Sequence, residues 1–187
     1  MSVTPLDVTL EYFEIFGFQR QFDIDQGQLS QQYRIIQATV HPDKFANATD
    51  AERLASVQTS SLINQAYQTL RDPLDRAKYL LGLYGIDLSV ETDTRMDPQF
   101  LMQQMELREA LENIGSNSDS LSKLLSLGDS LDLQVSNLLE KIAVLLNDPS
   151  IREKSSELSQ ARNLVRQLQF LSKLQSEISD KEEQLLI

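Results

Sequence analysis

The sequence predicts an all-α protein with two helical domains. Its 187 residues include many leucines but only six glycines, five prolines and no tryptophan. This composition favours helices over a turn-rich β-fold. Apolar residues recur at spacings of three and four along several stretches, as they do on the buried face of a helix. The length suits one large or two small domains, since domains typically contain about 100–150 residues.

Four helices are expected in the N-terminal part of the chain. The first is a short aromatic segment that begins at Tyr12 and ends at Gly17, a residue type that commonly terminates helices. The second begins near Asp25 and ends at His41, because Pro42 disfavours a helical conformation in the residue before it. The apolar stripe of this second helix consists of Leu29, Tyr33, Ile36 and Val40.

The third helix is expected to start near Thr49 or Asp50 and to end before Pro73. Its predicted buried stripe consists of Leu54, Val57, Ser61, Asn64 or Ile63, Tyr67 and Leu70. A fourth, shorter helix is expected over residues 74–84, and it stops at Gly85.

Three further helices are expected after a linker over residues 86–96, in which serine, threonine and acidic residues follow one another closely. Asp97 is a suitable N-cap for a helix that starts at Pro98 and breaks at residues 115–118. A long amphipathic helix comes next, and residues 147–149 then turn the chain into the last helix. The stripes of these two helices are Leu121, Leu124, Leu131, Val135, Leu138, Ile142 and Leu145, and Leu158, Ala161, Leu164, Leu168, Leu171 and Ile178.

These elements divide the chain into two all-helical domains, over residues 1–85 and 97–187. In the first domain, His41-Pro42-Asp43 connects two antiparallel amphipathic helices. The ordinary interpretation is that Pro42 ends a helix, Asp43 caps the next segment and His41 is an exposed loop residue. A single histidine without a matched base or nucleophile is not an active site. A functional loop would instead present donors and an acid to a partner in a rigid arrangement.

The charge and residue content exclude several classes of function. A net charge of −11 opposes binding to phosphate backbones, so we expect no nucleic-acid partner. The absence of cysteine and the single histidine exclude thiolate and multi-histidine metal sites, and we expect no metal and no cofactor. No apolar run approaches the roughly 18 residues that span a bilayer. The acidic N-terminus does not resemble a signal or transit peptide, so we expect a soluble protein without membrane association.

The surroundings of the His-Pro-Asp loop resemble a known domain family. The loop is followed by residues 63–73, INQAYQTLRDP, and then by Arg76-Ala77 and Tyr79-Leu80-Leu81. This combined pattern, over roughly residues 10–85, resembles the J-domain, in which the loop stimulates ATP hydrolysis by a DnaK-class chaperone. The resemblance implies chaperone contacts at His41, Pro42, Asp43, Arg34 and Lys44.

The helix before the loop departs from the J-domain pattern in its charge. In J-domains this helix usually displays a basic face toward the chaperone. Here Arg34 is the only basic residue between Gln28 and Val40, and Lys44 comes after the loop. We therefore expect modest electrostatic steering and pairing with one dedicated chaperone.

The helix that starts at Pro98 carries two apolar faces. At about 100° per residue, its core stripe falls within roughly 60°. That stripe consists of Phe100, Leu107, Leu111 and Ile114. The opposite side carries Leu101, Met102 and Met105 among Glu106, Glu109, Glu112 and Asn113. In the last helix, Phe170 lies about 130° from the centre of its core stripe. These residues either pack on the N-terminal domain or form an adaptable partner site.

Two segments of the second domain bring a more specific resemblance. They are residues 100–109, FLMQQMELRE, and residues 165–174, VRQLQFLSKL. Together with the J-domain pattern they resemble the HscB-type co-chaperones of iron–sulfur cluster assembly over essentially the whole chain. The resemblance implies a C-terminal three-helix bundle in an L-shaped arrangement with the J-domain. The implied scaffold contacts are Leu101, Met102, Met105, Glu106, Glu109 and Phe170.

The same resemblance implies partners and a setting. The bundle would bind a cluster scaffold protein of the IscU type and deliver it to a DnaK-class chaperone of the HscA type. The protein would be an ATPase-stimulating co-chaperone and not itself an enzyme. Some relatives carry an N-terminal cysteine zinc module, which this chain lacks. That difference favours the simpler bacterial form and a bacterial cytoplasmic location.

Three other functions are compatible with parts of the pattern. Glu106 and Glu109 could be the paired carboxylates of an enzyme, although solvated acids are the more usual interpretation. The chain could be a helical adaptor in which His-Pro-Asp is an ordinary turn. It could also be a general J-protein that serves varied unfolded clients, although the Leu-Met-Met face argues against this. Stimulation of a chaperone ATPase would distinguish a co-chaperone from the enzyme and from the helical adaptor. Competition by an unfolded peptide would support the general J-protein.

Overall fold

The computed structural model describes residues 10–88, 98–115 and 119–186, and these residues form helices and connecting segments without a β-strand. The predicted all-α class is therefore confirmed. By the contacts between Cα atoms, the chain divides into two compact units, Met1–Leu80 and Leu81–Ile187. This division falls inside the helix that precedes the predicted boundary at residue 85. The predicted Asp97 cap and most of the predicted linker lie outside the described residues.

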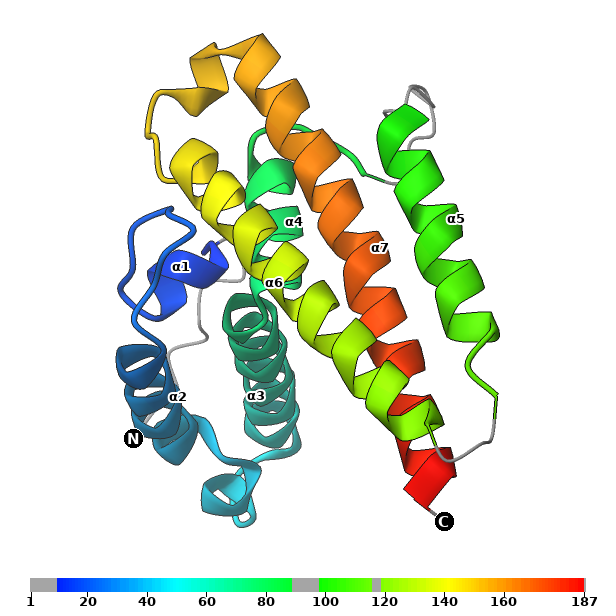
Figure 1. Ribbon diagram of the computed structural model, residues 1–187. Helices are drawn as coiled ribbons and strands as arrows, with labels where there is room; N and C mark the ends of the chain where they lie inside the picture. The colour runs from blue at the N-terminus through cyan, green and yellow to red at the C-terminus, as the bar shows by residue number, and fades with distance from the viewer. Residues whose placement is uncertain (1–9, 89–97, 116–118, 187) are drawn as a thin grey trace. The chain divides into compact units, whose positions relative to one another are not determined.

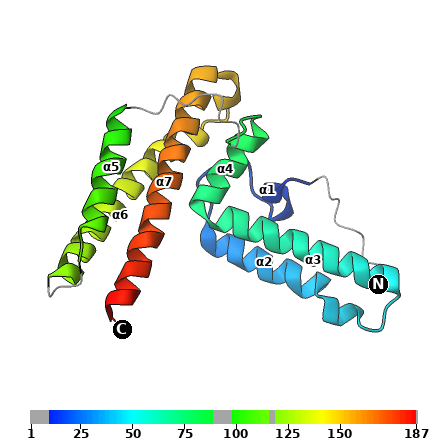
Figure 2. The ribbon, with the colours of Figure 1, turned by 90° about the vertical axis from the view of Figure 1, so that its right-hand side faces the viewer.

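The N-terminal unit is organised around an antiparallel helical hairpin (Figures 1 and 2). Its helices are α1 (Tyr12–Ile15), α2 (Gln26–Val40), α3 (Asp50–Arg71) and α4 (Pro73–Leu83), and a 3₁₀ helix, η1 (Pro42–Phe45), joins α2 to α3. Gly17 and Gly85 adopt positive φ angles of 72° and 79° just past α1 and α4, which is why glycine ends the helices there.

Side-chain caps fix where the two hairpin helices begin. The carboxylate of Asp25 accepts a hydrogen bond from the backbone N–H of Gln28 at 2.9 Å, at the start of α2. Thr49 and Glu52 form a reciprocal capping box at the start of α3. The hydrogen bonds from Thr49 lower the pKa of the Glu52 carboxyl. Both caps satisfy backbone N–H groups that have no partner within the helix.

The buried face of α3 differs from the predicted stripe at its N-terminal end. Leu54 and Val57 are more than half exposed, and Ser61 is also exposed. The buried residues are Ser56, Thr59, Ile63, Ala66 and Leu70. The reason is that this end of α3 meets the C-terminal backbone of α2, where small hydroxyl-bearing residues allow a close approach. Farther along, the prediction holds for Ile63 and Leu70.

Arg76 links three parts of the N-terminal unit from a buried position in α4. Its guanidinium lies 4.9 Å from the centroid of the Phe22 ring and donates to the backbone carbonyl of Leu70 at 2.5 Å. Burial lowers the pKa of Arg76, while the carboxylates of Asp23 and Asp72 oppose that effect. On the same helix, the Tyr79 ring stacks on Tyr12 with 4.4 Å between centroids. These contacts hold α1 and the end of α3 against α4.

The C-terminal unit contains three long helices, α5 (Pro98–Glu112), α6 (Ser120–Leu146) and α7 (Ser155–Leu186), with the 3₁₀ helix η2 (Ile151–Glu153) between the last two (Figure 1). α6 and α7 pack along each other as an antiparallel pair, and α5 lies beside α7. The predicted stripe of α6 is buried or half-buried throughout. In α7, Val165 and Leu174 join the buried stripe, whereas Leu164 is only half-buried. None of the helices in the described ranges is both long and apolar enough to cross a membrane.

Candidate functional site

The first candidate site is the loop that comes after α2. His41 leaves the helical conformation with φ −57° and ψ 131°, and Pro42 begins η1 directly after it. The backbone N–H of Lys44 donates to the carbonyl of His41 at 3.0 Å. Pro42 cannot continue α2, and its fixed φ suits the first position of the next helical turn. The loop is therefore a short ordered turn with a defined backbone.

Within this turn the imidazole of His41 is oriented by its neighbour. The Nδ1 atom of His41 accepts a hydrogen bond from the backbone N–H of Asp43 at 3.3 Å, and it lies 3.6 Å from the Asp43 carboxylate. A neutral imidazole that accepts through Nδ1 carries its proton on Nε2. The side chains of His41 and Asp43 are 55% and 91% exposed. The turn thus offers an N–H donor and a carboxylate acceptor to an approaching molecule.

The two predicted basic contacts lie on either side of His41. Arg34 is seven residues earlier on α2, about two turns away on the same side of the helix. Its Nε donates to the backbone carbonyl of Ser30 at 3.3 Å, and the side chain is exposed. Lys44 is exposed within η1. Lys44 therefore lies in the turn itself, and Arg34 lies about two helical turns earlier on α2.

The second candidate site is the face of α5 that points away from its core. Leu101, Met102 and Met105 are 42%, 62% and 72% exposed, and Glu106 and Glu109 are exposed beside them. On the opposite side of the helix, Phe100, Leu111 and Ile114 are buried, and Leu107 is half-buried. The helical wheel therefore separated these two faces correctly. Three large apolar side chains next to one another in solvent, with acids around them, are suited to a partner surface.

Phe170 of α7 meets α5 at the edge of this face. Its ring packs edge-on against Phe100, with centroids 5.9 Å apart, and the Arg108 guanidinium lies 5.5 Å from its centroid. Arg108 is seven residues after Leu101, so both lie on the same side of α5. Phe170 is consequently half-buried at the Leu101 side of the exposed face. Sequence reasoning missed Arg108, and its spacing from Leu101 was the only signal that could have indicated it.

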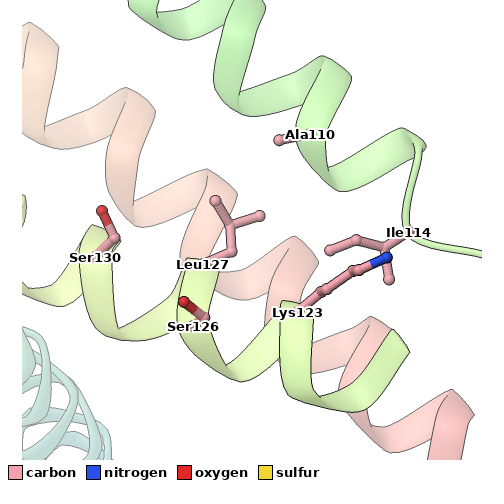
Figure 3. A pocket seen from close by; sticks show the side chains of 6 residues that line it. All are labelled: Ala110, Ile114, Lys123, Ser126, Leu127 and Ser130. Atoms are coloured by element: carbon pink, nitrogen blue, oxygen red, sulfur yellow. The ribbon is translucent and has the colours of Figure 1, made fainter. Parts of the chain in front are cut away.

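A groove separates the C-terminal half of α5 from α6 (Figure 3). It has a volume of about 380 Å³ and is open to solvent. α5 is instead bonded to α7, because the Lys181 ammonium donates to the backbone carbonyl of Leu111 at 2.6 Å. The residues that line the groove are Ala110, Ile114, Lys123, Ser126, Leu127 and Ser130.

The sequence matches two protein-family models, which together cover most of the chain. Residues 11–79 match the DnaJ domain, and residues 96–179 match the HSCB C-terminal oligomerisation domain. The chain is also 46% identical over 177 residues to a co-chaperone protein HscB homolog of Shewanella frigidimarina, and 41% identical to that of Shewanella pealeana. Each alignment covers 95% of this chain and 99% of the relative.

Solved structures give the same result for the fold. Chaperone HscB from Vibrio cholerae matches with a TM-score of 0.81 and 40% identity, over 94% of this chain and 99% of that one. Human co-chaperone protein HscB matches with a TM-score of 0.82 and 27% identity, over 95% of this chain and 84% of that one.

Proposed function

Because this chain belongs to the HscB family of J-domain co-chaperones, we propose that it acts in iron–sulfur cluster assembly by bringing a scaffold protein to a dedicated chaperone. The scaffold is of the IscU type and the chaperone is a DnaK-class protein of the HscA type. The observation that carries the proposal is that two differently built exposed surfaces lie on two separate units. One site is the polar turn at His41, and the other is the apolar face of α5.

The turn at His41 supports a role in chaperone contact. Its backbone is already ordered, and the imidazole is oriented through the N–H of Asp43. A surface that is ordered before binding loses little conformational freedom when it docks. Asp43, Arg34 and Lys44 add groups that can form charge-assisted hydrogen bonds with a partner. The protein would contribute no catalytic group of its own, and it would act by favouring the hydrolysis-competent state of the chaperone.

The exposed face of α5 supports a role in scaffold binding. Met102 and Met105 have flexible side chains that can adapt to a partner, and Leu101 extends the apolar area. Glu106 and Glu109 place carboxylates at the border, which favours a partner with basic groups around an apolar centre. Phe170, held by Phe100 and Arg108, provides a rigid aromatic edge beside them. The sequence contains no cysteine, so the cluster would stay on thiolate ligands of the scaffold.

The proposed mechanism is linkage of two binding events. When scaffold and chaperone occupy one molecule, their encounter becomes intramolecular and their effective concentration rises. The turn at His41 then shifts the chaperone toward the state that hydrolyses ATP and closes on the scaffold. We place this sequence of events in the bacterial cytoplasm, and it requires no cofactor of this protein.

The test of the chaperone contact is ATP hydrolysis by an HscA-type chaperone, measured against increasing concentrations of this protein. We expect the unmodified protein to stimulate the rate and the His41→Gln variant to give no stimulation at any concentration. The side chain of His41 is exposed, so the variant should melt at the same temperature as the unmodified protein. Full stimulation by a folded His41→Gln variant would contradict the assignment of the turn.

A further inference from the structure

One edge of the α2–α3 interface carries a ladder of hydrogen bonds beside its ring packing. The rungs come from α3 at intervals of three or four residues: Ser56, Ser60, Asn64 and Tyr67. Asn64 accepts from Tyr33 at 2.9 Å and also from the amide of Gln37. Tyr67 stacks on Tyr33 with 4.1 Å between centroids. Hydrogen bonds are directional, so a ladder of this kind fixes the register of the two helices more closely than apolar packing does.

The hydrogen bond of Ser56, the member of the ladder nearest the turn, differs from the others. Ser60 bonds to a side chain, because its hydroxyl donates to the Gln37 amide oxygen at 3.1 Å. Ser56 instead donates to a backbone atom, the carbonyl oxygen of Val40, at 2.7 Å. Ser56 is completely buried, and Val40 is also buried. This bond is therefore shielded from competition with water.

The carbonyl of Val40 needs such a donor because the helix ends there. In a continuing helix it would accept from the N–H of Lys44, but that N–H donates to the carbonyl of His41 in the turn. A buried carbonyl without a donor is costly. The Val40 carbonyl and the His41 N–H also belong to one rigid peptide plane. The hydroxyl of Ser56 therefore holds the plane from which His41 emerges.

We propose that Ser56 is a positioning residue for the His41 turn. It touches neither partner, and it acts by keeping the turn in the one orientation that the chaperone recognises. This role rests on the proposed chaperone contact at His41. Without the Ser56 hydroxyl, the peptide plane is free to rotate toward another donor, and only a fraction of the molecules present His41 correctly. Apparent affinity falls in proportion to that fraction, whereas the fully bound complex is unchanged.

The test compares Ser56→Ala with Ser60→Ala in the full-length protein. Both variants remove one hydroxyl and one hydrogen bond from the same face of α3, one helical turn apart. If the competent fraction falls to about a fifth in Ser56→Ala, the half-saturating concentration for stimulation of the chaperone ATPase rises about fivefold. The maximal rate stays that of the unmodified protein. Ser60→Ala should leave both quantities within about twofold, because its bond does not reach the turn.

A second measurement needs no chaperone. The three-bond coupling between the amide and α protons of His41 reports its φ angle, which is −57° in this structure. We expect Ser56→Ala to change this coupling and Ser60→Ala to leave it unchanged. The proposal would be overturned if Ser56→Ala changed neither the His41 coupling nor the half-saturating concentration for ATPase stimulation. It would also be overturned if Ser56→Ala and Ser60→Ala changed these quantities equally. If the unmodified protein gives no stimulation, the proposed function fails, and the coupling still decides whether Ser56 positions the turn.

Discussion

At the scale of single residues, Phe170 illustrates how a side chain can belong to both the core and a contact surface. Its ring is packed by Phe100 and Arg108, and it is also half exposed at the border of the α5 face. Replacing it would therefore disturb the α5–α7 contact together with any partner contact. Met105 is the better probe, because its side chain is 72% exposed.

We predict that Met105→Glu lowers the affinity for an IscU-type scaffold at least about tenfold, which corresponds to roughly 1.4 kcal/mol. The substitution removes an apolar contact and adds a third carboxylate beside Glu106 and Glu109. Leu133→Glu is the matched control, because Leu133 is 65% exposed and belongs to α6, a different helix from the one that carries this face. Calorimetric titration with the scaffold should show normal affinity for Leu133→Glu. If Met105→Glu bound the scaffold with normal affinity, the proposed scaffold-binding role of the α5 face would be contradicted.

At the scale of elements, the connection from α6 to α7 is organised by one carboxylate. Asp148 accepts from the N–H and hydroxyl of Ser150 at 2.9 and 2.7 Å, and from the Lys154 ammonium at 2.8 Å. These hydrogen bonds lower the pKa of Asp148 to about 2, and the bond with Asp148 raises the pKa of Lys154. The buried Ile151 then anchors η2 between the two helices.

The lowered pKa of Asp148 leads to a prediction about pH. The folded protein binds this proton less readily than the unfolded chain, so the ionised group stabilises the fold above about pH 4, and this stabilisation is lost as the pH falls toward about 2. Asp148→Asn should therefore melt at a lower temperature than the unmodified protein at pH 6, and the difference should close near pH 2. Asp129→Asn, which changes an exposed carboxylate on α6, serves as the control. A difference of the same size at both pH values would contradict the prediction.

Helix ends proved easier to predict than helix faces. Gly17, Pro42, Pro73 and Gly85 mark the ends of the N-terminal helices in the structure to within a residue or two, because their backbone constraints act locally. The predicted inner face of α3 was wrong near Leu54. A helical wheel considers only the polarity of the side chains on one helix, whereas α2 presents a backbone carbonyl to α3 there. The same limit applies to Val165, which is buried where Leu164 was expected.

The candidate sites were predictable to a similar degree. The turn at His41 and the exposed face at Met105 are visible in the sequence, since one is a motif and the other is a second apolar stripe. Ser56 and Arg108 were missed, because their contacts join residues that are far apart in the chain. Such contacts depend on how the helices pack against one another, and one sequence does not specify which residue faces which.

At the scale of the whole molecule, the proposed function requires two sites that act together. The turn at His41 belongs to the unit Met1–Leu80, and the α5 face belongs to the unit Leu81–Ile187. Each site is built from contacts within its own unit. Substitutions at one site should therefore leave the other intact, which allows the two activities to be separated.

The joint action of the two sites can be measured by single-turnover ATP hydrolysis on an HscA-type chaperone with this protein, an IscU-type scaffold, both or neither. We predict that both together accelerate hydrolysis more than the separate effects combined, because linkage raises the effective concentration of the scaffold at the chaperone. Met105→Glu should keep the scaffold-independent stimulation and lose the added effect, and His41→Gln should lose both. Stimulation by this protein that is the same with and without scaffold would contradict the two-site account and indicate a general J-protein.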